Sequence, residues 1–325
     1  MKLFIRSAHF YLIIVWVLSA SAQSKNYTNY HQQILAIEQL ISQDEYEIAL
    51  NSYDKLFEQY DFVFLKEYKV AAQIAAHLGD EYRAFDYLGL GVANGWTLDE
   101  IKDHELLKRL KKNPRWIDLE FNYEALRLDY LYRINDSLRN VVNELFKEDQ
   151  KMAFSYLFKP SEKAKNKFIE EKAIIISERH VKQLIEIIDS HGYPGEQLIG
   201  NSVWSSTILS HHNSLSPEYQ QQDQLYPSLR PKLLAAIDNG QLNPYHFAII
   251  EDWYITVKSD RKEHSYGIIH PLTKANFDHA DQMRANVHIR SIALRNALID
   301  IEAKTGIDLN LGYGSWLQGK INPTE

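Results

Sequence analysis

The sequence predicts a mainly α-helical protein in which helical hairpins are followed by a helical domain with a small β-hairpin. Over residues 30–119 apolar side chains recur three and four positions apart, as they do on one face of an amphipathic helix. Further along, a capping residue precedes proline at Ser216 and at Asn243, which is typical of a helix start. Strand-like alternation is confined to residues 254–257 and 266–269, and these two segments predict the hairpin.

Residues 1–22 have the pattern of a secretory signal peptide. Lys2 and Arg6 precede an apolar run over residues 10–18, and four small residues end at Ala22. The run is short for a hydrocarbon layer of ~30 Å, so we prefer cleavage after Ala22 to the alternative of a retained anchor. We therefore expect a periplasmic or secreted protein with no membrane span after signal cleavage.

Composition excludes several classes of protein. The chain is 45% hydrophobic, which is enough for buried cores, and its net charge of −7 argues against a nucleic-acid partner. It contains no cysteine, so it has neither a disulfide framework nor a lipid-modified cysteine. The one dense basic cluster, residues 108–112, is followed by Asn113 and Pro114 and reads as a solvated helix end.

A repeat is visible in the first part of the chain. Ala49 and Ala84 are 35 residues apart, and the same offset relates Tyr53 to Leu88. The spacing is close to the 34-residue period of tetratricopeptide helix pairs, which residues 23–125 resemble in degenerate form. The resemblance implies a concave helical surface, through which the N-terminal helices would hold a protein or peptide partner.

Local signals place the remaining elements. A helix begins at Pro114, and Ser161 caps another region that runs to Gly192. Gly240 ends the helix before Asn243, and the last helix is expected over residues 285–304.

Short motifs over residues 135–319 follow the order found in a bacterial domain of unknown function, DUF6624. They comprise Asp149 with Gln150, residues 191–194, residues 198–200, His212, residues 217–220, residues 225–229, Asp252, and Tyr266 with Gly267. On this resemblance residues 126–325 form a DUF6624-like helical domain, and no activity is implied by the family name. The chain departs from the pattern at three places. His211 stands where the family has Gln, Trp253 with Tyr254 where it has Arg-Val, and Ile268 with Ile269 where it has Thr-Gln.

The resemblance suggests a candidate catalytic group. His212 would act as general base, Asp252 would orient it or a water, and Tyr266 or His191 would donate to a developing negative charge. The candidate ligand-binding residues are Asp149, Gln150, His191, His211 and Trp253. For every one of these residues a structural role is the other interpretation, and it is the preferred one. We expect no cofactor and no metal site, since the adjacent His211 and His212 would diverge by about 100° on a helix.

Two functions follow from these residues. The preferred one is a protein- or ligand-binding module of the cell envelope, and the alternative is a hydrolase that acts on envelope material. The chain has no Gly-x-Ser-x-Gly elbow, His-Glu-x-x-His pair, phosphate loop or dinucleotide fingerprint, and whether it is an enzyme stays open. A binding module should expose aromatic side chains on its N-terminal helices. A hydrolase should bring His212, Asp252 and Tyr266 within hydrogen-bond reach of one cavity.

Overall fold

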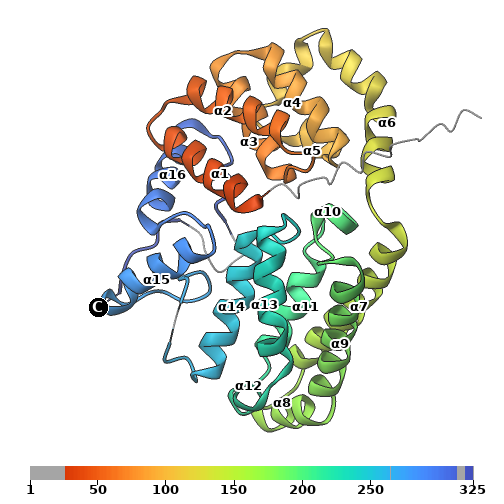
Figure 1. The fold of residues 1–325 in the computed structure, drawn as a ribbon, viewed down its shortest axis with the longest axis vertical. Helices are drawn as coiled ribbons and strands as arrows, with labels where there is room; N and C mark the ends of the chain where they lie inside the picture. Colours follow the sequence, from red (N-terminus) through yellow and green to blue (C-terminus); the bar gives the residue numbers. More distant parts are fainter. Residues whose placement is uncertain (1–25, 264, 313–318, 325) are drawn as a thin grey trace, which may run out of the picture.

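The computed structural model describes residues 26–263, 265–312 and 319–324, and this part of the chain is mainly helical, as predicted. In Figure 1 the chain starts in the helices at the top, descends along α6, and forms the lower part of the molecule with α7–α14. It then returns along α15 and α16 to the neighbourhood of α1. The predicted signal peptide lies outside the described residues.

Consecutive antiparallel helices form the N-terminal region. They are α1 (Tyr27–Ser42), α2 (Tyr46–Gln59), α3 (Leu65–Leu78), α4 (Glu81–Ala93), α5 (Leu98–Asp103) and the short 3₁₀ helix η1 (Lys108–Lys112). The repeat positions Ala49 and Ala84 are fully buried, and the second pair of repeat positions, Tyr53 and Leu88, is at most 1% exposed. Alanine at these positions lets neighbouring helices approach closely, an arrangement compatible with tetratricopeptide-like hairpins.

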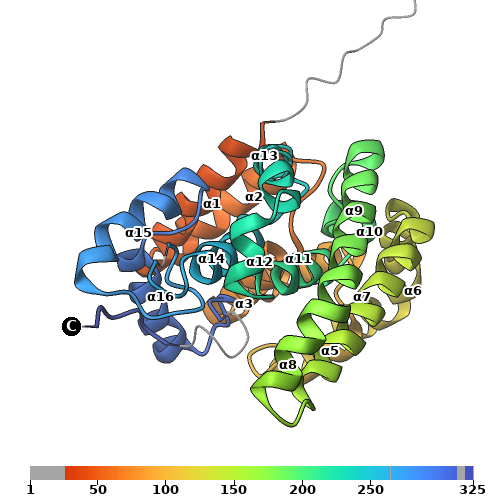
Figure 2. The same ribbon diagram turned by 90° about the horizontal axis from the view of Figure 1, so that it is seen from below.

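Three long helices and three short elements continue the chain. They are α6 (Arg115–Arg133), α7 (Asp136–Leu157), α8 (Glu162–Phe168), the π-helical turn η2 (Ile169–Ala173), α9 (Ile174–His191) and the short α10 (Glu196–Ile199). Ser161 caps α8 as predicted, because its hydroxyl accepts the N–H of Ala164. Figure 2 shows α7, α8 and α9 as a layer beside α11, and α7 and α9 both contact α11.

The last helices are α11 (Trp204–Asn213), α12 (Pro217–Gln222), α13 (Leu225–Asp238), α14 (Pro244–Lys258), α15 (Lys274–Asn286) and α16 (Ile292–Thr305). Ser216 and Asn243 cap α12 and α14, each with proline at the first helical position, as predicted. The helix expected over residues 285–304 is instead divided by residues 287–291. Its second part, α16, begins where the Ser291 side chain accepts the N–H of Leu294.

The predicted β-hairpin is wrong. Residues 254–257 lie in α14 instead. Because this helix packs against α11, α12 and α13, it buries apolar residues on several of its sides. Residues 266–269 form bends around the carboxylate of Asp252, which accepts the backbone N–H groups of Tyr266, Ile268 and Ile269. A distant carboxylate therefore satisfies donors that a partner strand was expected to satisfy.

Two large hydrophobic clusters stabilise the fold. One is centred on α1–α5, and the other on α9, α11, α13 and α14. The C-terminal segment belongs to the first cluster, because Leu298, Ile301 and Leu311 are buried there. The Gln73 side chain holds the C-terminal segment against α3. Its Oε1 accepts the N–H of Asp308 at 2.7 Å, and its Nε2 donates to the carbonyl of Asp308 at 3.1 Å. Helices in the described residues all fall short of the length and apolarity that a membrane span needs.

Candidate ligand-binding site

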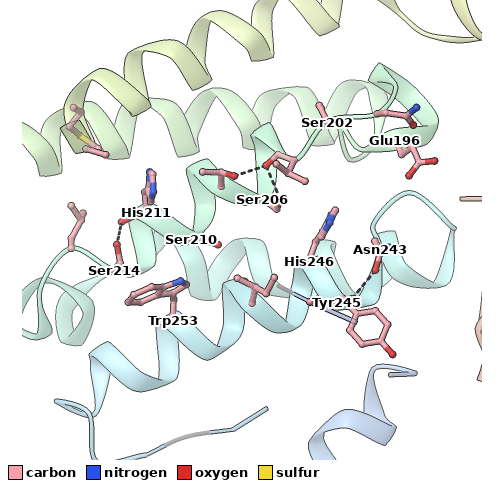
Figure 3. A pocket seen from close by; sticks show the side chains of 18 of the residues that line it. Glu196, Ser202, Ser206, Ser210, His211, Ser214, Asn243, Tyr245, His246 and Trp253 are labelled. Carbon is pink, nitrogen blue, oxygen red and sulfur yellow. Dashed lines mark hydrogen bonds between the residues drawn. The ribbon is translucent and has the colours of Figure 1, made fainter. Parts of the chain in front are cut away.

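A cavity of about 990 Å³ lies between the two clusters, at the upper end of the size range of small-molecule sites. Its walls come from the start of α3, the end of α7, the turn η2, and facing sides of α11 and α14. Figure 3 shows labelled side chains of α11 and α14 that line the cavity.

The α11 wall is rich in hydroxyl groups. Ser202, Ser206, Ser210 and Ser214 recur every four residues, so one face of the helix and its approach carries all four. The hydroxyls of Ser206 and Ser214 donate to the backbone carbonyls of Val203 and His211, both at 2.9 Å. Ser210 is 7% exposed and forms part of the wall between them.

The facing wall on α14 is more apolar. Asn243, His246, Ile249 and Trp253 follow one another at helical spacing along this side of the helix. In Figure 3, Trp253 lies at the same end as His211 and Ser214, whereas His246 and Asn243 lie toward the end of Glu196.

One end of the cavity is apolar. Met152 and Tyr156 of α7 line it together with Phe168, Ile169 and Leu215. The π-helical turn η2 contributes Ile169 and Ala173 to this wall, and such turns are frequent at functional sites.

The opposite end carries charged and titratable groups. Glu196 accepts the N–H of Leu65 at 2.6 Å, and burial raises the pKa of its carboxyl group to about 7. Burial, together with the charge of Lys66, lowers the pKa of His246 to about 4. Lys66 forms an ion pair with Glu67 at 3.1 Å. Near neutral pH this end therefore offers an ammonium group, a neutral imidazole and a carboxyl group that is close to its titration point.

A histidine and a carboxylate meet at the apolar end. His211 Nδ1 lies 2.6 Å from Asp149 Oδ2, and Gln150 Nε2 donates to the same oxygen at 3.2 Å. Asp149 is fully buried, whereas the side chain of His211 is 32% exposed and lines the cavity. In the neutral form of the ring this contact places the proton on Nδ1 and leaves Nε2 as the acceptor.

The structure brings together four of the five predicted ligand-binding residues. His211 and Trp253 line the cavity, and Asp149 and Gln150 lie behind His211. His191 is exposed at the end of α9 and is not part of the cavity wall.

The predicted catalytic group does not line the cavity, although the N–H of Tyr266 donates to Asp252 at 2.9 Å. His212 is fully buried with Nδ1 2.9 Å from Ser177 Oγ, and it faces away from the cavity that its neighbour His211 lines. Asp252 is 1% exposed and holds the backbone of residues 265–269. Tyr266 is also 1% exposed, and its carbonyl accepts from Arg284 Nε. All three have structural surroundings, and none lines the cavity.

Sequence reasoning missed the hydroxyl face of α11 and the charged end of the cavity. The four-residue recurrence from Ser202 to Ser214 was a usable signal, because that spacing aligns side chains on a helix. Glu196 and Lys66 gave no local signal, since they meet only through tertiary folding. Within the described residues, no cluster of three His, Asp or Glu side chains has an arrangement that could hold a metal ion.

Comparison with known proteins adds no relative. No protein-family model, no curated protein and no solved structure matches this chain. The resemblance to DUF6624 therefore stays a prediction that depends on the motifs alone, and the function has to be argued from the cavity.

Proposed function

We propose that the protein is an exported ligand-binding protein of the cell envelope, and that its cavity holds a molecule with an apolar part and a polar part. The observation that carries the proposal is the cavity of about 990 Å³ with unlike ends. Export is the expectation from the signal-peptide pattern of residues 1–22.

The walls indicate how such a ligand lies. An alkyl or other apolar segment fits against Met152, Phe168 and Leu215, where it would remove apolar surface from water. Trp253 offers a flat ring beside it, suited to stacking against a sugar ring or an unsaturated group. Polar atoms of the ligand would then lie along the α11 hydroxyls and toward Lys66 at the other end.

A thermal-shift series tests the proposal on residues 23–325, which retain every described residue. The probes are dodecanoate and a dodecyl glycoside, both below their micelle concentrations, and maltose as the polar group alone. We expect both chain-bearing probes to stabilise the protein, by about 2.7 kcal/mol at a hundred times Kd, and maltose to have little effect. Absence of stabilisation by either chain-bearing probe contradicts the proposal.

Variants locate the binding. Ser210→Trp adds an indole to the cavity wall and should abolish the shift, and Trp253→Ala should weaken binding about fivefold or more by removing a stacking surface. Tyr82→Ala is the matched control, because Tyr82 is 70% exposed and outside the cavity. Equal shifts in the Ser210→Trp protein and the parent would place the ligand elsewhere.

Hydrolysis is the second candidate, and the Asp149 and His211 pair favours it. His211 Nε2 would accept a proton from water while the water oxygen attacks an ester or amide carbonyl, and the ring would return that proton to the leaving group. Release of nitrophenol from p-nitrophenyl octanoate tests this step. A rate that His211→Ala lowers at least about a hundredfold, and the exposed control His279→Ala does not, supports hydrolysis. A parent rate equal to that of buffer contradicts it.

A protein partner for the N-terminal helices stays a prediction. Tyr82 is the aromatic side chain that α1–α5 expose most, and the Arg115 guanidinium covers its ring at 4.6 Å. The cavity, rather than this surface, therefore carries the proposed function.

A further inference from the structure

The end of α7 exposes large apolar side chains beside the cavity. Phe154, Leu157 and Phe158, which we call the apolar rim, are 62%, 69% and 70% exposed. The rings of Phe154 and Phe158 lie with their centroids 4.6 Å apart, and Leu157 also lines the cavity. The rim therefore adjoins the apolar end of the cavity, and α8, which follows it, lies at one end of the molecule's long axis in Figure 1.

The same segment is basic in an acidic protein. Residues 151–172 contain six lysines and three glutamates, whereas the whole chain has a net charge of −7. Lys151, Lys163, Lys167 and Lys172 are exposed. The two half-buried lysines of the segment, Lys159 and Lys165, cover the rings of Phe168 and Tyr156, so their charges also lie close to the cavity wall.

A second apolar surface provides a contrast. On α6, Ile117, Phe121 and Tyr132 are 70%, 85% and 82% exposed. The basic cluster of residues 108–112 precedes α6, but residues 115–133 themselves contain no lysine, three arginines and four acidic residues, so the helix that carries these rings has no excess of positive charge. Apolarity alone therefore does not distinguish the rim, but the combination of exposed aromatic rings with surrounding lysines does. That combination suits the boundary between anionic headgroups and acyl chains.

We infer that the apolar rim and the lysines of residues 151–172 dock the protein on the surface of a bilayer that contains anionic lipids. Phe154 and Phe158 enter the headgroup region, the exposed lysines approach the phosphates, and the apolar end of the cavity comes to lie at the membrane surface. The inference extends the proposed function, since docking gives a chain-bearing ligand a short path between bilayer and cavity. Docking itself does not require an occupied cavity, so the two can be tested apart.

Vesicle co-sedimentation tests docking on residues 23–325. We expect the protein to bind vesicles of phosphatidylglycerol and phosphatidylcholine and to bind pure phosphatidylcholine far more weakly. Phe154→Ser with Phe158→Ser should lower the partition coefficient about tenfold or more, because two exposed rings leave the interface. The matched control is Phe121→Ser with Tyr132→Ser on α6, which removes two rings that are more exposed still and should leave binding unchanged.

The charge contribution has its own pair of variants. Lys163→Gln with Lys167→Gln should weaken binding to anionic vesicles about fivefold for each lysine. Lys111→Gln with Lys112→Gln, in the exposed basic cluster of η1, removes the same charge away from the rim and should have little effect. Urea midpoints of all four proteins should match the parent, since the altered side chains are exposed.

Each outcome decides the inference. The inference is overturned if the parent does not bind anionic vesicles. It is also overturned if the rim and α6 variants lose vesicle binding equally, and a protein partner would then be the occupant of the exposed apolar surface. The Ser210→Trp protein separates the two proposals. If it binds vesicles but not dodecanoate, both are supported; if the parent binds vesicles but no chain-bearing probe, docking stands and the proposed ligand fails.

Discussion

Asp252 was predicted to be catalytic, and its surroundings predict instead that it holds the fold. Its Oδ1 accepts the N–H and hydroxyl of Ser265 at 3.2 and 3.0 Å and the N–H of Tyr266 at 2.9 Å. Its Oδ2 accepts the N–H groups of Ile268 and Ile269 at 2.8 and 3.2 Å. Every one of these donors is buried.

The substitution Asp252→Asn replaces one accepting oxygen by an amide that can only donate. In the better of its two orientations, the amide leaves two buried N–H groups without an acceptor. At about 1–3 kcal/mol for each orphaned donor, the free energy of unfolding should fall by about 2–6 kcal/mol. Asp252→Ala removes both oxygens and should cost more. Since domains are stable by about 5–15 kcal/mol, either change is large.

Urea unfolding measures the loss, and amide hydrogen exchange locates it. We expect the amides of Tyr266, Ile268 and Ile269 to exchange faster in the Asp252→Asn protein. Asp278→Asn, an exposed carboxylate on α15, is the control and should change stability by less than about 0.5 kcal/mol. If Asp252→Asn costs less than about 1 kcal/mol and leaves exchange unchanged, the structural account of Asp252 is refuted.

Three further predictions follow from buried groups. The pKa of Glu196 is raised to about 7, so the folded state holds this proton more tightly than the unfolded state. The free energy of unfolding should therefore fall by up to about 3 kcal/mol from pH 4.5 to 7. Urea midpoints measured across that range should show this decline in the parent but not in the Glu196→Gln protein. Ala84→Leu enlarges a fully buried alanine and should cost about 1–3 kcal/mol in thermal unfolding, whereas Asn51→Leu at an exposed position of α2 should not. Gly200 has φ +79° and a Cβ there would meet the Tyr130 hydroxyl, so Gly200→Ala should lower the unfolding temperature; an unchanged temperature contradicts the close packing.

Local signals predicted much of the fold. Ser161, Ser216 and Asn243 were assigned as caps from the sequence and do cap helices, because a cap depends on only three or four neighbouring residues. The hairpin failed for the opposite reason. Residues 254–257 have β-branched and aromatic side chains, yet the packing of α14 among other helices decides their conformation.

The site was predicted in part. His211 and Trp253 are predicted from the sequence as ligand-binding residues, and both line the cavity. Asp149 and Gln150 are predicted too, but their contact with His211 arises only through tertiary folding. His212 was assigned the role that its cavity-lining neighbour His211 fits better. Adjacent residues on a helix face different directions, and the sequence does not reveal which of the two faces the cavity.

The claim that the cavity binds a chain-bearing ligand is tested most directly by calorimetric titration of dodecanoate into residues 23–325 and into the Ser210→Trp protein. The account predicts saturable one-site binding to the parent, with a negative heat-capacity change from burial of the chain, and no binding to the variant. A parent that shows no heat of binding at several temperatures, or a variant that binds as tightly as the parent, would contradict it.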